Sequence, residues 1–410
     1  MTARTRIING RFLIPMMTGV QRYAREIVGA LDQLVAQGHP LARGLEIEIV
    51  CPNGAVNDLD LQRITVRAAG RTRGYLWENV ELPLAARGPI LSLCNAGPLL
   101  ARRHIVCIHD VNTYLAPSSY SWKFRALYRV MLPVLGRAAA RVTTVSQFSA
   151  DKISKFGVAA SSKISVVPNG REHALRWRPS HSAATRSAAG ENVIVVVGSP
   201  APHKNLGMLH SLAGQLTSAG LKLAIVGALN PNVFGSHDFG IADAGVVWLG
   251  RLSDDEIAAL LGSCLCLAMP SLTEGFGLPA LEAMSVGCPV VVSNCASLPE
   301  ICADAALYAS AAEPQQWLAR FLELRSSPNL RAEMISRGRK ASLKFSWTAS
   351  AERYLDLFAE IDGVSNDRGR GPGRSVSTPL APAVLETTYV PEAARAARWL
   401  EEVAAPKIRS

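Results

Sequence analysis

The sequence has little that would mark a membrane-spanning or exported protein. Of its 410 residues 49% are hydrophobic, yet no apolar run reaches the roughly 18 residues that a membrane-spanning helix needs. The apolar patch within MTARTRIINGRFLIPMMTGV is too short and too often interrupted for a secretory signal. We therefore expect a cytoplasmic protein, long enough for two domains.

The eight cysteines also lack the spacing of a metal or redox site. No C-x-x-C pair occurs, and several cysteines lie in apolar runs such as GSCLCLAMP and RHIVCIHD. This pattern favours buried free thiols that pack as small hydrophobic groups, and disulfides are not expected in a reducing compartment. We expect no metal site.

Negative charge is scarce in one half of the chain. The net charge is +10, and residues 1–172 carry 22 Lys and Arg against 11 Asp and Glu. Such an excess attracts an anionic ligand, a polyanion or an anionic membrane surface. No nucleic-acid-binding motif accompanies the charge, so a nucleic-acid partner is not expected.

Short apolar runs alternate with amphipathic stretches, as in parallel sheets with crossover helices. Expected strands in the first half are TRIING, LEIEIV, PILSLC, RHIVCIHD, RVTTVS and ISVVPNG, and in the second half VIVVVGSP, LKLAIVG, GVVWLG, LCLAMPS and PVVVS. Expected helices cover residues 19–38, 118–140, 205–220 and 253–264, followed by two amphipathic helices, the last at 346–361.

The pattern predicts an α/β protein with two Rossmann-like, doubly wound domains facing across a cleft. We place the domains at residues 1–172 and 190–345, joined by a polar connection. A C-terminal helix at 346–362 is expected to pack back on the first domain. Residues 363–410 have the composition of a flexible tail with one possible short helix.

The stretch PSLTEGFGLPALEAMSVGCPVVVSN, residues 270–294, carries the clearest chemistry. Its EGFG turn follows a buried strand, and Pro279 and Gly287 fit the start and end of a helix. Free N–H groups at that start form an anion site, flanked by Glu274 and Glu282. Carboxylates accept hydrogen bonds from vicinal hydroxyls, so a nucleotide sugar fits. Alternatively, Glu274 caps the helix and Glu282 is a solvated surface residue.

The motif EGFGLPALEAM resembles the E-x7-E signature of retaining GT-B glycosyltransferases of the family 4 type, especially bacterial mannosyltransferases of polysaccharide and lipopolysaccharide assembly. Residues 6–360 share further motifs: TGVQRYAREI, WENVELP, IHDVNTY, TTVSQFSADKI, SVVPNG, VGSPAPHKNL, LGRLSDDEIAALL and SLPEI. The resemblance implies that residues 1–172 bind the acceptor and that residues 190–345 bind the nucleotide sugar. It also implies no metal and no other cofactor.

The resemblance assigns donor-binding roles. Glu274 would meet the hydroxyls of the donor sugar, and Glu282 the ribose diol. The remaining residues of the loop and helix start would lie beside the sugar and distal phosphate: Gly275, Phe276, Gly277 and Leu278.

Lys204, in VGSPAPHKNL, would bind the donor diphosphate and stabilise the leaving charge. Relatives usually carry arginine where this chain has His203, and often where it has Ser199. Whether Arg251 or a basic N-domain residue compensates stays open. Without the resemblance, Lys204 is an ordinary surface lysine.

In the N-terminal domain, His109 would approach the donor sugar, and Gly19, after Thr18, would lie near the phosphate or acceptor. The alternative for His109 is a satisfied pair with Asp110 at the end of a strand. The only D-x-D, at residues 58–60, is interpreted as a solvated loop. Glu300 is expected to shape its loop.

The resemblance implies retaining transfer of a hexose, mannose from GDP-mannose, to a lipid-linked or polysaccharide acceptor. The alternatives are a UDP-sugar donor, a GT-B sugar-nucleotide epimerase, or a non-catalytic binding protein. Residues 119–141 mix aromatic and basic side chains, which favours a peripheral position on the anionic inner face of the plasma membrane. An ordinary two-sided helix is the alternative for this segment.

Overall fold

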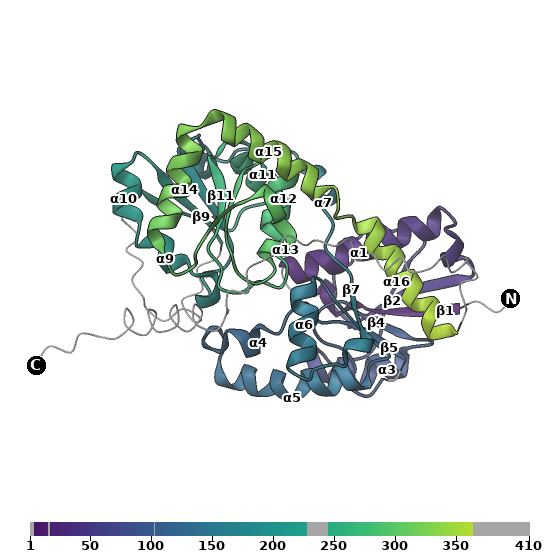
Figure 1. Cartoon of the computed structure of the whole chain (residues 1–410). Coiled ribbons are helices and arrows are strands. Elements are labelled where there is room, and N and C mark those ends of the chain that lie inside the picture. Colours follow the sequence, from purple (N-terminus) through teal and green to yellow (C-terminus); the bar gives the residue numbers. More distant parts are fainter. Residues whose placement is uncertain (1–3, 15–16, 102, 228–244, 364–410) are drawn as a thin grey trace, which may run out of the picture.

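The structure, a computed structural model, describes residues 4–14, 17–101, 103–227 and 245–363. Figure 1 shows two α/β domains, with the last described helix, α16 (Trp347–Asp362), returning to the N-terminal domain. Apart from Gly363, the predicted tail lies outside the described residues.

The N-terminal domain is built on a seven-stranded parallel sheet in the order β3-β2-β1-β4-β5-β6-β7. Its strands are β1 (Arg4–Asn9), β2 (Leu45–Cys51), β3 (Thr65–Ala68), β4 (Ile90–Ser92), β5 (His104–Cys107), β6 (Arg141–Thr144) and β7 (Ile164–Val166). Strand β3 was not predicted, because this edge strand is short and has no fully buried residue.

The C-terminal domain repeats the same winding in a six-stranded parallel sheet, in the order β10-β9-β8-β11-β12-β13. Its strands are β8 (Val193–Val197), β9 (Lys222–Val226), β10 (Val246–Gly250), β11 (Cys266–Met269), β12 (Val290–Ser293) and β13 (Leu307–Ala309). Strands buried on both faces read as continuous apolar runs, which is why VIVVV and VVVS were recognisable. The predicted fold class of two Rossmann-like domains is confirmed.

Helices cover these sheets. Those before β8 are α1 (Gly19–Ala36), α2 (Gly74–Leu76), η3 (Trp77–Glu81), α3 (Leu82–Ala85), α4 (Asn112–Leu115), α5 (Trp122–Ala138), α6 (Gln147–Lys155), α7 (Glu172–Leu175) and α8 (Ala183–Ser187). Those after β8 are α9 (Leu206–His210), α10 (Ala213–Ser218), α11 (Asp254–Ser263), α12 (Leu278–Val286), α13 (Leu298–Cys302), α14 (Pro314–Ser326), α15 (Pro328–Ser342) and α16.

Two predicted helices are each divided in the structure. The helix expected at 205–220 breaks into α9 and α10, where the Ser211 hydroxyl donates to the carbonyl of Met208 at 2.7 Å. The first of the two helices expected before Gly363 is divided into α14 and α15 by Ser327 and Pro328. Ser327 is extended and caps α15 by accepting from the N–H of Leu330.

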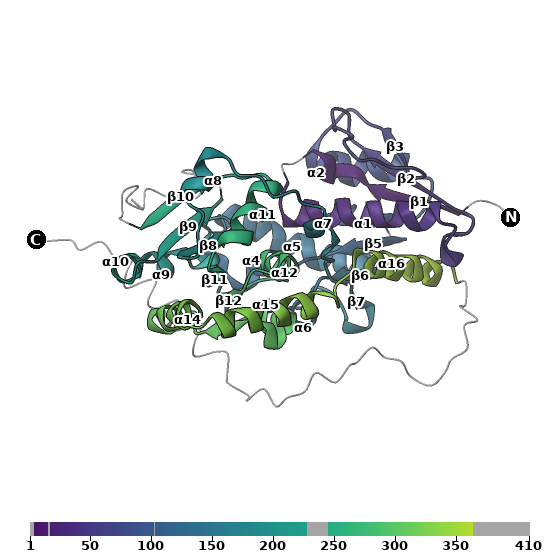
Figure 2. The same ribbon diagram turned by 90° about the horizontal axis from the view of Figure 1, so that it is seen from above.

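Helix α16 packs against α1, as both views show (Figures 1 and 2). The Tyr354 hydroxyl lies 2.9 Å from the Tyr23 hydroxyl and 2.8 Å from that of Thr143, all in the buried interior. The C-terminal helix therefore belongs to the core of the N-terminal domain, although the chain has passed through the other domain in between.

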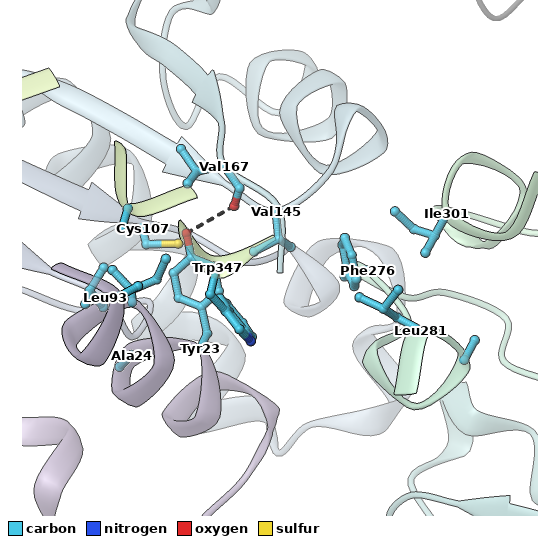
Figure 3. Close-up of a cluster of buried hydrophobic side chains, with 14 of the residues drawn as sticks. Tyr23, Ala24, Leu93, Cys107, Val145, Val167, Phe276, Leu281, Ile301 and Trp347 are labelled. Atoms are coloured by element: carbon cyan, nitrogen blue, oxygen red, sulfur yellow. Dashed lines mark hydrogen bonds between the residues drawn. The ribbon is translucent and has the colours of Figure 1, made fainter. Parts of the chain in front are cut away.

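One hydrophobic cluster runs through both domains. Figure 3 shows Tyr23 and Trp347 on one side and Phe276 and Leu281 on the other. The rings of Tyr23 and Trp347 are 5.6 Å apart at an interplanar angle of 71°. Because this apolar packing continues between the domains, it fixes how their site-bearing loops face each other.

All eight cysteines are free, six of them buried and Cys94 and Cys295 half-buried. Within the part of the chain that the structure describes, no helix is long and apolar enough to cross a membrane.

Candidate functional site

The predicted anion site lies at the start of α12, directly after the loop that follows β11. Gly277 holds the position before the helix with a φ of 97°, and Gly287 ends the helix with a φ of 84°. A Cβ on Gly277 would also meet Leu298 Cδ2 at 2.6 Å, so only glycine fits this turn. The first N–H groups of α12 and its helix dipole thus create positive potential at the mouth of the loop.

Lys204 and Glu274 meet beside this helix end. The Lys204 Nζ lies 2.6 Å from Glu274 Oε1, and the Ser271 hydroxyl donates to the same oxygen at 2.7 Å. Glu274 is 7% exposed. Burial raises the pKa of Glu274, but the charge and hydrogen bond of Lys204 outweigh this and hold it below its ordinary value. The alternative that Glu274 caps α12 is wrong, because no side chain caps this helix.

The chain brings these two residues together from different strands. Lys204 ends η6 (Pro202–Lys204), a short turn after β8, and Glu274 follows β11, the neighbour of β8 in the sheet. Carboxyl ends of adjacent parallel strands meet at one edge, where ligands of this fold class bind.

His203 and Ser199 stand where relatives carry arginine, and neither supplies a permanent positive charge. His203 is buried, and burial, followed by the charge of Lys204, lowers its pKa to about 4, so it is neutral at pH 7. Ser199 is exposed in the loop after β8. Arg251 follows β10, the edge strand, which β9 separates from β8.

Glu282 points into the junction between the domains. It is 7% exposed, so the alternative of a solvated surface residue is wrong. Its Oε1 accepts from His173 Nε2 at 2.8 Å, and Arg22 Nε lies 3.7 Å away. Arg22 also forms two hydrogen bonds with Asp254, of 2.7 and 2.5 Å.

The N-terminal domain presents the backbone of His109 to this site, while the His109 ring turns away. His109 Nε2 donates to the carbonyl of Leu93 at 2.8 Å, and the ring packs edge-on against Tyr23 at 4.8 Å. The His109 carbonyl oxygen would lie 2.9 Å from a Cβ added to Gly275. The imidazole is therefore satisfied within its own domain, and its carbonyl faces the donor loop.

Asp110 and Tyr120 lie next to neighbours of the Lys204–Glu274 pair, Asp110 beside Gly275 and Tyr120 against the His203 ring, although neither was assigned to the site from the sequence. Burial raises the pKa of Asp110. The negative charge of Glu274 raises it further, and the positive charge of Lys204 lowers it. Burial, then the charges of Asp110 and Glu274, raise the pKa of Tyr120. Asp110 had a signal in its position next to His109 at a strand end, but Tyr120 had none.

The two domains are closed on one another around the EGFG turn. The hydroxyls of Ser146 and Ser149 donate to the carbonyl of Gly275 at 2.6 and 3.1 Å. Gly19 begins α1, and a Cβ there would lie 3.9 Å from Leu278 Cδ2. Glu300 accepts from the first two N–H groups of α6, at 2.8 and 3.0 Å.

Among the described residues no group of three or more His, Cys, Asp or Glu side chains is placed to hold a metal ion. In the D-x-D stretch, Asp58 is an exposed residue paired with Arg25 at 2.5 Å.

Comparison with known proteins places both domains in described families. Residues 17–175 match glycosyltransferase family 4, and residues 178–341 match glycosyl transferases group 1. The chain is 29% identical to the MMP alpha-(1->4)-mannosyltransferase of Mycolicibacterium hassiacum, over 66% of this chain and 67% of that protein. It is 28% identical to the O-antigen chain mannosyltransferase RfbU of Salmonella typhimurium, over 57% of this chain and 63% of that protein. The chain thus aligns with about two thirds of the length of these relatives.

Solved structures share the fold at low sequence identity. Sucrose-phosphate synthase from Thermosynechococcus elongatus superposes with a TM-score of 0.64 and 16% identity, covering 88% of this chain and 100% of that one. HepE from Anabaena, solved with UDP and glucose, gives 0.65 and 16%, covering 87% and 100%. Together with the family matches, this confirms the fold and the family that the sequence resemblance predicted: the chain belongs to the glycosyltransferases of the GT-B fold and is close to bacterial mannosyltransferases.

Proposed function

We propose that the protein is a retaining mannosyltransferase that moves mannose from GDP-mannose to a lipid-linked saccharide during surface-glycan assembly. The observation that carries this proposal is the ion pair between the half-buried Lys204 and the buried Glu274, 2.6 Å apart beside the start of α12. This pair places an ammonium group that can bind a diphosphate next to a carboxylate that can accept hydrogen bonds from sugar hydroxyls. Mannose is favoured because the relatives named above are mannosyltransferases.

In this proposal the donor lies along α12. The diphosphate meets the N–H groups at the helix start and the Lys204 ammonium. Glu274, in the loop before the helix, accepts hydrogen bonds from hydroxyls of the hexose, and Glu282, about one turn into the helix, accepts from the ribose diol. Because Lys204 and Ser271 already hold Glu274 in place, little reorganisation accompanies donor binding.

The reaction breaks the bond between the anomeric carbon and the β-phosphate oxygen. An acceptor hydroxyl attacks from the same face as the sugar becomes oxocarbenium-like, and its proton passes to the leaving phosphate oxygen. The new bond joins the anomeric carbon to the acceptor oxygen, so configuration is retained and GDP leaves. Lys204 and the α12 dipole stabilise the charge that develops on the diphosphate, and domain closure orients the reactants.

A row of rings supports an acceptor path from α5 to the donor. Tyr128, Phe124 and Tyr120 stack in sequence with ring centroids 4.1 and 5.5 Å apart, and His203 follows at 6.1 Å. His203 directly precedes Lys204. Aromatic faces suit the apolar faces of a saccharide, and this row begins on a helix whose outer end is exposed.

That helix supports a membrane-bound acceptor. Trp122 and Val130 are 67% and 68% exposed, and the buried residues of α5 all lie in its second half, from Met131 to Gly136. Only this second half therefore behaves as an ordinary helix with one buried and one exposed face. The first half combines exposed apolar groups with basic ones, as a helix lying on an anionic surface does.

The test is transfer of label from radiolabelled GDP-mannose to lipid-extractable product in membrane extract. We expect Lys204→Ala and Glu274→Ala each to lower kcat/KM by about 10²–10³, the usual loss for one transition-state contact. Lys222→Ala is the matched control. This exposed lysine is the first residue of β9, so it lies at the amino ends of the strands, away from the site at their carboxyl ends. Unchanged turnover in both site variants would refute the proposal, as would transfer from a UDP-sugar in place of GDP-mannose. Conversion of the donor without acceptor, followed by NMR, would instead indicate an epimerase.

A further inference from the structure

His173 is a buried histidine whose two ring nitrogens both have defined partners. It lies in α7, on the first connection between the domains, and is 2% exposed. The Trp347 indole N–H donates to His173 Nδ1 at 3.0 Å. Because an indole N–H can only donate, Nδ1 must be the acceptor, and the ring proton resides on Nε2. Nε2 therefore donates to Glu282 at 2.8 Å.

Trp347 ties this histidine to the second connection between the domains. It is the first residue of α16, where the chain returns to the N-terminal domain. Its backbone N–H donates to the Glu172 carboxylate at 3.0 Å. A Cβ on Gly170 would meet this nitrogen at 2.1 Å, so the two connections touch backbone to backbone. Both crossings are thereby fastened together at the histidine.

Glu282 receives its orientation from this junction. Its Oε1 is held by His173, with the Arg22 guanidinium at 3.7 Å, while Oε2 accepts no hydrogen bond from the described residues. A buried carboxylate with one oxygen fixed and the other available presents a single direction to a ligand.

We propose that His173 is a positioning residue for nucleotide binding. Through the Trp347–His173–Glu282 chain, the junction of the two connections aims Glu282 at the vicinal hydroxyls of a nucleotide ribose. This inference rests on the proposed function, in which Glu282 contacts the ribose. It adds that the contact requires the junction to be assembled, which couples recognition of the nucleotide to the relative placement of the domains.

Calorimetric titration of the full chain with GDP and with 2′,3′-dideoxy-GDP isolates this contact. The wild type is expected to bind GDP more tightly, since only GDP offers the ribose diol. His173→Phe keeps the ring volume but removes both nitrogens. We expect it to weaken GDP binding roughly tenfold, the usual cost of a misplaced charged hydrogen bond, and to leave dideoxy-GDP binding within about twofold.

Two further variants grade the effect. Trp347→Phe keeps the imidazole but removes the indole N–H that holds the ring proton on Nε2. We therefore expect an intermediate loss of the preference for GDP. His173→Gln can still donate an N–H to Glu282 and should restore part of the preference. His181→Phe is the control, because this exposed histidine lies on the same connection. In turnover, His173→Phe should raise the KM for the donor with little change in kcat.

The outcomes separate the two proposals. Equal weakening of both nucleotides in His173→Phe would mean a purely structural role and would overturn the inference, as would an unchanged preference for GDP. Glu282→Ala tests the underlying assignment: if it leaves the preference intact, Glu282 does not bind the ribose, and that part of the proposed function fails. Loss of preference in Glu282→Ala with full retention in His173→Phe would overturn the positioning role alone.

Discussion

The charge of Lys204, which is half-buried, makes the burial of the Glu274 carboxylate tolerable. An isolated buried carboxylate would take up a proton, whereas the pKa of Glu274 is lowered because Lys204 outweighs the effect of burial. Glu274 is thus ionised at neutral pH and acts only as a hydrogen-bond acceptor. This is the state that binding of sugar hydroxyls requires.

His104 gives a pH-dependent contribution to stability. It is fully buried in β5, its Nε2 lies 2.9 Å from the Ser92 hydroxyl, and burial lowers its pKa to about 3. The unfolded chain, with a pKa near 6.5, binds the proton more readily, so stability is complete above pH 6.5 and falls as the pH drops toward 3. When the pH is lowered from 7.5 to 5.5, we expect His104 to reduce the free energy of unfolding by about 1.4 kcal/mol.

Urea denaturation at these two pH values measures the effect. His104→Gln cannot titrate and should lose about 1.4 kcal/mol less than the wild type over this interval. A control substitution, His181→Gln, alters an exposed histidine and should follow the wild type. If His104→Gln shows the wild-type pH slope, His104 is not the source of the dependence.

Helix α5 has two halves with different environments. Trp122, Leu127 and Val130 are 67%, 45% and 68% exposed in the first half, and Pro133 lies inside the second half, among the buried residues. Exposed apolar side chains interleaved with basic ones favour the surface of an anionic membrane.

Replacing Trp122, Leu127 and Val130 together by serine should weaken binding to vesicles of phosphatidylethanolamine and phosphatidylglycerol. Loss of three apolar groups is expected to lower partitioning at least roughly tenfold in co-sedimentation. Leu343→Ser, at a 62% exposed leucine in the C-terminal domain, should have no effect. Wild-type binding by the triple variant would contradict a membrane-facing α5.

At the scale of the two domains, the EGFG turn is a place of close approach. Gly275 receives two hydroxyls from α6 and its flank, and a Cβ there would meet the His109 carbonyl oxygen at 2.9 Å and Asp110 Cβ at 3.1 Å. The backbone of Gly275 does not lie at positive φ. Any methyl group here acts on the contact between the domains and leaves the turn itself unstrained.

Gly275→Ala should therefore lower activity, which depends on domain closure, without lowering the stability of the protein. We expect kcat/KM to fall about 10–100-fold, because a displacement of a few tenths of an ångström to 1 Å misplaces the donor loop. The midpoint of thermal unfolding should stay close to that of Gly262→Ala, a control in α11 with open space around its Cβ position. Full activity of Gly275→Ala would show that this close approach is not needed for turnover.

Local patterns explain why much of the fold and part of the site were predictable. Runs such as VIVVV and the glycines around α12 act through periodicity and backbone freedom, which neighbouring residues determine. The short edge strand β3 and the breaks at Ser211 and Ser327 escaped, because tertiary packing and local side-chain bonds override helix or strand propensity there.

The amino-acid order was sufficient for two parallel sheets, the E-x7-E motif and the place of Lys204 after β8. Three features needed the folded chain: the pairing of Lys204 with Glu274, the inward turn of the His109 ring, and the bond from His173 to Glu282. Each joins residues that are distant in the chain or depends on what packs around them. Strand order and domain closure bring such partners together, and neither leaves a periodic trace in a single sequence.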